Sequence, residues 1–558
     1  MGSLLDVRRI TESLIQSGIK RKLEEWGVPG EFPVSVEIPK QEEHGDFATN
    51  AALQLGAHLK KNPREVAMDL LDSIRREDGK GWFRDLSVAG PGFINIVLSD
   101  DAWREGLAAA LEKGERFGAA SPGKGERVLL EFVSANPTGP LHVGHGRGAV
   151  VGDALARILA FTGCEVTTEY YVNDVGNQID NLGKSFYVRY LQLFGKEARL
   201  PEDGYRGEYL VEIAREFREE VGDRYLAVTE EEAFPIFRRV ACDRILDGIR
   251  KDLDAFHVHF DRWFRERSLH ESGAVDDVVG DLRDRGQLYE AGGAVYFKSE
   301  SHGDEKDRVL VRADGRTTYF ASDLAYHRAK FRQEFSRVVD IWGADHHGYA
   351  PRISAALKGL GVDDSRLEIL LVQFVSLIRD GKMVSMSTRT GKFTTLREVM
   401  DEVGVDAARF FFLLRSFHSH LEFDLTLAKT QSSENPVYYI QYVHARICSI
   451  FREAAERGIV LSVTPPLSVL SLPDETNLMK KVARFPDVVA ESARAREPHR
   501  IPFYLLDLAR EFHAFYHNHR FLGETAERTQ GRLALATAVR NVVATGLSLI
   551  GVSAPERM

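Results

Sequence analysis

The sequence predicts an α/β protein whose central part is a Rossmann-type, doubly wound parallel sheet. Three stretches have the apolar character of buried strands and alternate with helical patterns: residues 127–133, 165–172 and 337–343. A further stretch, 367–374, continues the series. Strands that alternate with helices form parallel sheets, and such sheets bind ligands at the carboxyl ends of their strands. A chain of 558 residues is too long for a single core, so several domains are expected.

The regions on the N-terminal side of this sheet differ in sequence character. Residues 1–118 mix helical patterns with short strands such as 93–97, which predicts an α+β N-terminal domain. A linker-like stretch rich in Gly, Ser, Pro and Lys, residues 117–125, then leads into a central domain, 119–425. Within that domain, residues from about 185 to 310 are charge-rich and mostly helical in pattern. We interpret them as a helical insertion between the two halves of the sheet.

Residues 426–558 form an all-helical C-terminal domain in this interpretation. One apolar face recurs there at helical spacing, formed by Ile440, Val443, Ile447 and Ile450. The formal net charge of the whole chain is −10, but the stretch from residue 441 onward carries 15 Lys and Arg against 12 Asp and Glu. The C-terminal part is therefore mildly basic, which permits contact with RNA without demonstrating it.

Composition excludes several other classes of protein. Hydrophobic content of 44% and charged content of 28% are ordinary for a globular chain. The three cysteines, Cys164, Cys242 and Cys448, lie far apart, so neither a zinc site nor a disulfide framework is expected and a reducing compartment fits best. No apolar run approaches the roughly 18 residues that span a bilayer, and the N-terminus lacks a signal-peptide core. We expect a cytoplasmic protein without a membrane partner. A monomer is expected too, although no pattern sets the oligomeric state.

The most informative residues are His142-Val143-Gly144-His145. They follow a predicted strand and a Pro- and Gly-containing connector, and apolar residues recur after them at helical spacing until Gly163. The motif thus opens a helix directly after a strand, where free N–H groups and the helix dipole attract phosphate. Two imidazoles one turn apart add donors, and Gly144 lets a flat ring approach the backbone. This pattern favours an ATP site that transfers the nucleotide. A partial metal site, or two surface histidines, is the alternative.

A second signal is the loop 381–392, which follows the apolar stretch 367–374 and is rich in hydroxyls and cations. Opposite a helix N-terminus, such a loop can close over a triphosphate, and its charge can stabilise a leaving pyrophosphate. By itself the loop could equally be a solvated basic surface segment. Downstream of a His-x-Gly-His motif in an α/β framework, the nucleotide-binding interpretation is favoured.

Together these motifs resemble the two signatures of class I aminoacyl-tRNA synthetases, and the chain as a whole resembles the arginyl-tRNA synthetases. The match lies in residues 131–145, 171–177, 318–326 and 436–446, and residues 45–50 fit that family's additional N-terminal domain. The resemblance implies a Rossmann catalytic domain, a helical anticodon-binding domain and an N-terminal domain that contacts the tRNA elbow. It also implies that L-arginine and ATP yield arginyl-adenylate and pyrophosphate. The arginyl group is then transferred to the 2′-hydroxyl of the terminal adenosine of tRNA. Mg²⁺ is expected to arrive on ATP, with no protein-bound metal or organic cofactor.

The second signature departs from the family pattern. Ser385 and Thr388 occupy its two lysine positions, and Gly139 stands where some arginyl enzymes carry a compensating lysine. Lys382, Arg389 and Lys392 are therefore candidates for the cation that neutralises the β- and γ-phosphates. By resemblance, the catalytic residues are His142, His145, Lys382 and Arg389.

The resemblance also assigns binding residues. ATP is expected at Pro140, Gly144, His145, Gly343, Ala344, Asp345, Met386 and Ser387. Arginine is expected at Glu131, Asn136, Asp174, Tyr319, Asp323 and His347. Asp323 would pair with the guanidinium and Tyr319, one helical turn earlier, would pack on it. The expected tRNA contacts are Tyr438, Tyr442 and Arg446, with ordinary helix packing an equal alternative for Tyr442.

Two other classes remain open from the sequence. A small-molecule nucleotidylyltransferase also uses a His-x-Gly-His motif, but it is ordinarily far shorter and would leave the C-terminal domain unexplained. A non-catalytic RNA-binding relative is suggested by the missing signature lysines. Retention of both motif histidines, and of the presumed arginine pocket, speaks against it.

Overall fold

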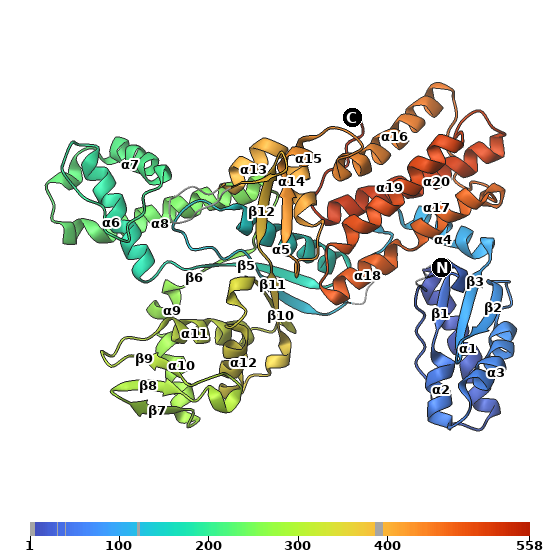
Figure 1. Ribbon diagram of the computed structural model, residues 1–558, viewed down its shortest axis with the longest axis horizontal. Coiled ribbons are helices and arrows are strands. Elements are labelled where there is room, and N and C mark those ends of the chain that lie inside the picture. The colour runs from blue at the N-terminus through green and yellow to red at the C-terminus, as the bar shows by residue number, and fades with distance from the viewer. Residues whose placement is uncertain (1–5, 31, 40, 120–122, 385–393) are drawn as a thin grey trace.

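The computed structural model describes residues 6–30, 32–39, 41–119, 123–384 and 394–558. They form an elongated molecule with a helical projection at one end and the N-terminal domain at the other (Figure 1). No helix in these five ranges is long and apolar enough to cross a membrane.

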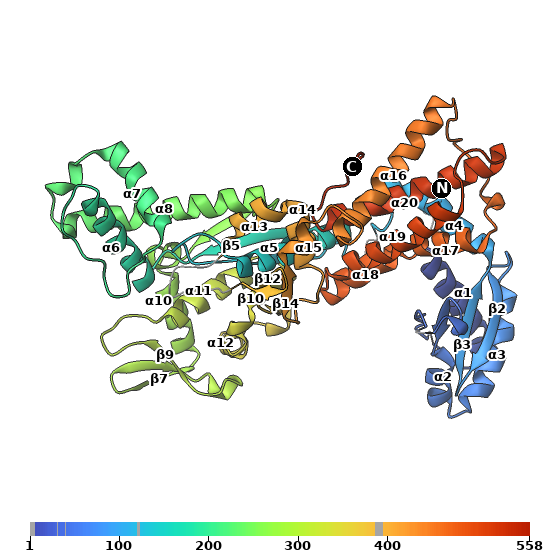
Figure 2. The same cartoon turned by 45° about the horizontal axis from the view of Figure 1, so that its top comes forward.

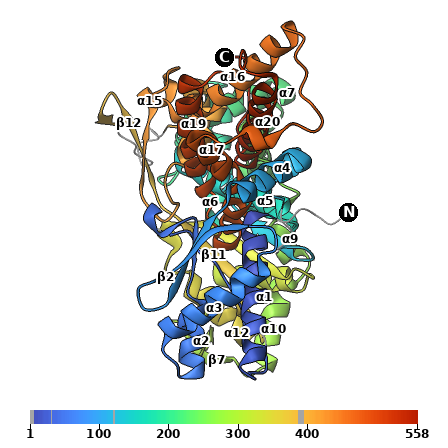
Figure 3. The same cartoon turned by 90° about the vertical axis from the view of Figure 1, so that its right-hand side faces the viewer.

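The N-terminal domain is a small α+β unit with its own core. Its helices are α1 (Val7–Glu25), α2 (Ala51–Leu59) and α3 (Pro63–Glu77), and its antiparallel sheet has the order β1 (Phe47–Thr49), β3 (Phe93–Leu98), β2 (Phe83–Ala89). Asp6 caps α1, and Asn62 caps α3 in front of Pro63, as helix starts prefer. The following helix α4 (Asp100–Lys113) packs against the C-terminal helices, so this domain sits below them (Figure 3).

The predicted parallel sheet is confirmed. Its order is β11 (Leu367–Val372), β10 (Arg337–Gly343), β4 (Arg127–Glu131), β5 (Glu165–Val172), β6 (Arg262–Arg265), and every neighbouring pair is parallel. The chain starts at the central strand β4, winds out to β6, and then crosses to β10 and β11, as in a doubly wound fold. Helix α5 (Val143–Phe161) connects β4 to β5, and α12 (Ala350–Gly359) connects β10 to β11.

The region predicted as one helical insertion, about 185–310, is divided in two by β6. The first part is helical: α6 (Asn177–Gln192), α7 (Glu208–Val221) and α8 (Glu230–Ala255). The second part contains α9 (Arg267–Glu271), α10 (Ala274–Asp284) and the antiparallel strands β7 (Leu288–Ala291), β8 (Ala294–Phe297) and β9 (Arg308–Val311). Helix α11 (Tyr319–Phe331) then returns to the sheet. Strand β6 escapes sequence analysis because its four residues, Arg-Trp-Phe-Arg, contain no apolar run.

A second small sheet carries the signature loop. It has the order β13 (Lys382–Met383), β12 (Val375–Arg379), β14 (Leu421–Asp424), with α13 (Leu396–Val403), α14 (Val405–Phe412) and α15 (Leu425–Lys429) beside it.

The C-terminal domain is all helical, as predicted. Its helices are α16 (Pro436–Glu456), α17 (Pro473–Ala483), α18 (Phe485–Ala495), α19 (Arg500–Asn518) and α20 (Ala526–Leu549). Helix α20 contacts α16, α17 and α19, and buries residues on all sides, including Leu533, Ala534, Leu535 and Ala536 in succession. It therefore forms the centre of this domain (Figure 2), with the buried Arg532 paired to Glu475 of α17.

Candidate active site

The two motif histidines cap the start of α5 reciprocally. Nδ1 of His142 accepts from the amides of Gly144 and His145 at 3.1 and 3.4 Å, and Nδ1 of His145 accepts from the His142 amide at 3.3 Å. The two rings stack with centroids 3.6 Å apart. Because each Nδ1 accepts a hydrogen bond, each neutral ring carries its own proton on Nε2. The pair thus presents two Nε2–H donors at a helix N-terminus.

Both imidazoles are neutral at pH 7. Burial lowers the pKa of His142, although its own backbone and the Asp345 carboxylate act in the opposite direction. Burial also lowers the pKa of His145 to about 3, and the neighbouring His142 adds to this effect. Attraction for phosphate therefore comes from N–H dipoles rather than from full positive charges.

Gly144 leaves room for the ring of His142 itself. A Cβ at position 144 would lie 3.0 Å from Cε1 of His142, which is tighter than ordinary contact. Sequence analysis expected this glycine to admit a flat ring, and the ring in place is the capping imidazole. Pro140 lies half-buried in the connector before the helix.

The chain directly after the signature loop is hydrogen-bonded to the same helix start. The amide of Val143 donates to the Thr394 carbonyl at 3.3 Å, and the amide of Leu396 donates to the Leu141 carbonyl at 2.8 Å. Lys382 lies exposed on β13, at the other end of the loop. The predicted residues Met386, Ser387 and Arg389, and the candidate Lys392, lie outside the described residues.

Arg147, one turn further along α5, joins this helix to the base of the loop-bearing sheet. Its fully buried guanidinium donates to the carbonyls of Gln373 and Ser419, both at 2.8 Å, and of Ser416 at 2.9 Å. Burial lowers the pKa of Arg147 to about 10, so it stays charged at neutral pH. One side chain thus fixes α5 relative to β12 and β14.

Replacing Arg147 by Met is expected to destabilise the protein by about 3 kcal/mol. Three carbonyls lose their charged donor, and a group left unsatisfied where water cannot replace the donor costs about 1–3 kcal/mol before local relaxation. Chemical denaturation measures this loss. The control is Arg510→Met, which removes a surface guanidinium that is 72% exposed. Equal stability of the two variants would show that Arg147 is not a tie between these elements.

The end of β10 forms another side of the site. Gly343 is the last residue of β10, and Ala344 and Asp345 follow in a short 3₁₀ turn. The Asp345 carboxylate is close enough to His142 to raise its pKa. Asp345, one of the three residues expected at the adenosine edge, therefore lies near His142, at the carboxyl edge of the sheet. Nowhere in the described ranges do three or more His, Cys, Asp or Glu side chains group as a metal site.

Two carboxylates lie close together at this edge, the half-buried Asp323 on α11 and the buried Glu266 directly after β6. Burial raises the pKa of Asp323, and the Tyr349 hydroxyl, which donates to Oδ2, opposes the rise. Burial, reinforced by the Asp323 charge, raises the pKa of Glu266 to about 7. Within the described part of the chain, no Lys or Arg forms an ion pair with either carboxylate, and the imidazole of His270 is 3.8 Å from Glu266. The pair is therefore an acidic socket without a strong cation of its own.

Tyr319 and Asn136 meet at the turn after β5. A Cβ on Gly176 would lie 2.4 Å from the Tyr319 hydroxyl, so the ring packs directly on this glycine. Asn136 donates to Gln178 at 2.8 Å, two residues further on. Tyr319, the first residue of α11, is 50% exposed and borders the socket one turn before Asp323.

Comparison with known proteins gives a consistent result along the chain. The family model for the class I tRNA synthetase (R) catalytic domain matches residues 106–411. The models for the arginyl tRNA synthetase N-terminal domain and the DALR anticodon binding domain match residues 13–98 and 440–558. This chain belongs to the arginyl-tRNA synthetase family. The resemblance inferred from the sequence motifs is confirmed.

Individual members of the arginyl-tRNA synthetase family are similar over nearly the whole chain. The arginine–tRNA ligase of Desulfosudis oleivorans is 51% identical over 532 residues, which are 94% of this chain and 95% of the relative. That of Geobacter sp. strain M21 is 49% identical, covering 95% and 96%. The Thermus thermophilus arginyl-tRNA synthetase structure matches with a TM-score of 0.76 and 25% identity, over 99% of this chain and 100% of that one.

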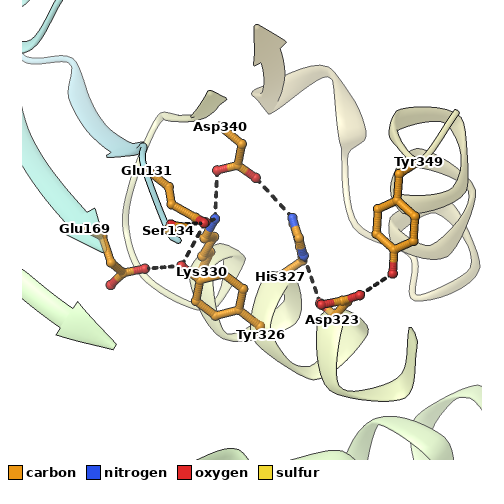
Figure 4. Close-up of polar contacts among 9 residues, drawn as sticks. All are labelled: Glu131, Ser134, Glu169, Asp323, Tyr326, His327, Lys330, Asp340 and Tyr349. Atoms are coloured by element: carbon orange, nitrogen blue, oxygen red, sulfur yellow. Dashed lines mark hydrogen bonds and ion pairs between the residues drawn. The ribbon is translucent and has the colours of Figure 1, made fainter. Parts of the chain in front are cut away.

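Some residues expected to bind arginine by analogy with these synthetases already have internal partners. The Asp174 carboxylate is bound by Arg267 at 2.8 Å and Arg265 at 3.4 Å. Glu131 is buried and accepts from Ser134 at 2.8 Å and Tyr326 at 2.9 Å, and it contacts Lys330 (Figure 4). Direct contact of Asp174 or Glu131 with arginine stays a prediction.

Glu266 and Tyr349 are not among the residues that the sequence predicts for the site. Glu266 follows the four-residue strand β6, which gives no strand signal, so its place at a strand end could not be seen. His347 was selected by analogy with relatives, but it is exposed and its Nδ1 is 3.2 Å from the Ala344 carbonyl. Tyr349, two residues later, is the side chain that reaches Asp323. An aromatic residue shortly after a strand end was the only available signal.

The predicted tRNA contacts lie on one face of α16. Tyr438 and Tyr442 are stacked with centroids 6.3 Å apart, and the Arg446 guanidinium lies 4.4 Å from the Tyr442 ring. Tyr516 of α19 covers the other side of Arg446 at 4.2 Å. Tyr442 and Tyr516 remain 37% and 36% exposed, so aromatic faces are available at the surface.

Proposed function

We propose that this chain ligates L-arginine to tRNA and that its acidic socket selects the substrate's side chain. The carboxylate of arginine attacks the α-phosphate of ATP, pyrophosphate leaves, and the 2′-hydroxyl of the terminal adenosine then takes the arginyl group from the adenylate. Little acid–base chemistry is needed, so positioning and charge stabilisation carry the rate. The Nε2–H donors of His142 and His145, at the α5 N-terminus, are placed to stabilise charge on the α-phosphate.

The observation that carries the proposal is the pair of neighbouring carboxylates, the half-buried Asp323 and the buried Glu266. A buried carboxylate without a cation is costly, and a guanidinium supplies a charge and several donors in a planar fork. Tyr319 at the border of the socket offers a ring on which the guanidinium can stack. A neutral side chain of similar size would leave both carboxylates unpaired, which disfavours its binding.

Arginine binding is expected to strengthen as the pH rises through 7, because the guanidinium requires ionised Glu266. With a pKa of about 7 in the free protein, most Glu266 is protonated at pH 6. The arginine KM at pH 6 is then about 10-fold above its plateau at high pH. Arginine-dependent ATP–pyrophosphate exchange, assayed with tRNA present between pH 6 and 8.5, measures this.

The matched variant is Glu266→Gln, for which the arginine KM is expected to be high and independent of pH. Glu266 also makes the stability of the free protein depend on pH, in the direction opposite to its effect on arginine binding. The folded pKa of Glu266 lies above its ordinary value of 4.5, so Glu266 stabilises the free protein fully below pH 4.5, and this contribution is lost as the pH rises through 7. A pH dependence retained by Glu266→Gln would remove Glu266 from the arginine site.

The remaining parts of the proposal concern ATP, tRNA and the cell. Mg²⁺ arrives bound to ATP, and exposed Lys382 is the described candidate for a cation near its outer phosphates. Unpaired anticodon bases stack on Tyr438, Tyr442, Arg446 and Tyr516, since aromatic and guanidinium faces accept bases of any sequence. Residues 1–118 contact the tRNA elbow, residues 119–425 carry out catalysis, and residues 426–558 bind the anticodon. The enzyme acts as a cytoplasmic monomer, and its three free, buried cysteines fit a reducing compartment.

A further inference from the structure

Three carboxylates stand side by side across the centre of the parallel sheet. In the strand register, Asp340 of β10 pairs with Glu131 of β4, and Glu131 pairs with Glu169 of β5. Residues in register on adjacent strands point to the same face, so the row faces α11 (Figure 4). All three are buried, with Asp340 wholly inaccessible. Like charges opposite each other destabilise a sheet, so this row needs compensation.

Lys330 of α11 supplies that compensation. Its ammonium is 2.7 Å from Asp340 and also contacts Glu131, and the side chain is 1% exposed. Burial by itself lowers the pKa of Lys330, but the two carboxylates outweigh it and the pKa lies above its ordinary value. The Tyr326 hydroxyl lies 2.9 Å from Glu131 and 2.7 Å from Glu169. Its single proton serves only one of them at a time. Burial raises the pKa of Glu169, although the Lys330 charge and the Tyr326 hydroxyl oppose the rise.

The same network reaches the acidic socket through His327. Its Nε2 is 3.1 Å from Asp340, and its Nδ1 is 2.8 Å from the carbonyl of Asp323. Asp340 thus bridges Lys330 and His327, and the network joins the end of β4 to the first turns of α11. These two elements carry Glu131 and Asp323, which lie on different parts of the chain.

The Glu131 end of the network fixes a strained turn. Val133 and Ser134 have φ angles of +67° and +42°, a region that costs roughly 1–2 kcal/mol for residues other than glycine. The Ser134 hydroxyl donates to Glu131 at 2.8 Å and accepts from the Tyr171 amide at 3.1 Å. The turn leads directly into the connector that carries Asn136 and, beyond it, His142.

We propose that Lys330 is a positioning residue for arginine. Through Glu131 and Asp340, its ammonium holds the end of β4, with the strained turn after it, at a fixed place relative to Asp323. Lys330 does not touch the substrate. The inference rests on the arginine site proposed above, and it predicts that loss of this buried charge acts on arginine while leaving ATP binding unchanged.

The test is Lys330→Met, which keeps the length of the side chain and removes its charge. The kcat/KM for arginine is expected to fall about 10- to 100-fold, the range typical of residues that support a direct contact, while the KM for ATP is unchanged. The matched control is Arg532→Met, which breaks the buried Arg532–Glu475 pair (2.9 Å) in the helical domain. Both variants lower the melting temperature, but only Lys330→Met is expected to raise the arginine KM.

A double-mutant cycle with Glu131→Gln tests the route. If Lys330 acts through Glu131, the kcat/KM for arginine of the double variant is little lower than that of the worse single variant. If the fold-losses of the two single variants multiply in the double variant, the two residues act independently and the proposal is overturned. An arginine KM in Lys330→Met equal to that of Arg532→Met also overturns it, provided that Asp323→Asn raises the arginine KM. If Asp323→Asn and Glu266→Gln both keep the wild-type arginine KM, the proposed arginine site itself fails, and the positioning inference falls with it.

Discussion

Asp323→Asn is expected to abolish most arginine activation and, at the same time, to make the ligand-free protein more stable. The carboxylate lies in the socket beside Glu266 with no Lys or Arg paired to it in the described structure, so its charge is a cost until a guanidinium arrives. Removing one partner of a buried, hydrogen-bonded charge pair costs about 2–5 kcal/mol. The kcat/KM for arginine should therefore fall about 10²- to 10³-fold.

The two effects of this substitution are measured separately. Arginine-dependent ATP–pyrophosphate exchange, with tRNA present, gives the kinetic loss, and a thermal melt without substrates gives stability, which should rise by about 1–2 °C. Asp314→Asn is the control, because Asp314 is a partly exposed carboxylate paired with Arg316. A drop in melting temperature with unchanged arginine kinetics would mean that Asp323 is a structural residue.

His145→Ala is expected to lower kcat for pyrophosphate exchange about 10²- to 10³-fold, with little change in the arginine KM. The Nε2–H donor is aimed at charge that develops in the transition state, and loss of one such donor typically has this effect. Because the pKa of His145 is lowered to about 3, the ring stays neutral throughout the working range, and its titration leaves no inflection in the wild-type profile between pH 6 and 9.

Two substitutions of His142 distinguish its role in capping α5 from its role in catalysis. His142→Asn keeps a side chain that can cap α5, whereas His142→Ala loses the cap as well, at about 1 kcal/mol of stability. Both are expected to lose exchange activity to a similar extent. His259→Ala, at an exposed ring paired with Asp254, is the control. If His145→Ala were as active as His259→Ala, the motif histidines would be only a structural cap.

The parts of the fold that sequence patterns predict are those with strong apolar periodicity. Strands β5 and β10 match their predicted ranges, 165–172 and 337–343, because both are buried runs rich in β-branched and aromatic residues. The predicted strands 127–133 and 367–374 end two residues early. After β4 the chain enters the strained turn at Val133, and such backbone conformations leave no signal in side-chain pattern.

The candidate site also has parts that the sequence predicts and parts that it does not. The histidine pair was predictable because a short motif, a strand before it and a helix after it all occur within a few residues of one another. The arginine socket was only half predictable, since Asp323 and Tyr319 share a helix while Glu266 arrives from a distant, four-residue strand. The Lys330 network depends on strand register between β10, β4 and β5, and register is a property of the assembled sheet alone.

The attachment of the N-terminal domain to the C-terminal helices has a consequence for biosynthesis. Helix α4 packs on α17, Arg104 donates to the Leu470 carbonyl, and Lys480 pairs with Asp46 at 2.6 Å. The first hundred residues leave the ribosome long before these partners, on the order of tens of seconds at ordinary elongation rates. They must therefore fold around their own sheet first. The surface of α4 that packs on the C-terminal helices stays exposed to solvent until translation is nearly complete.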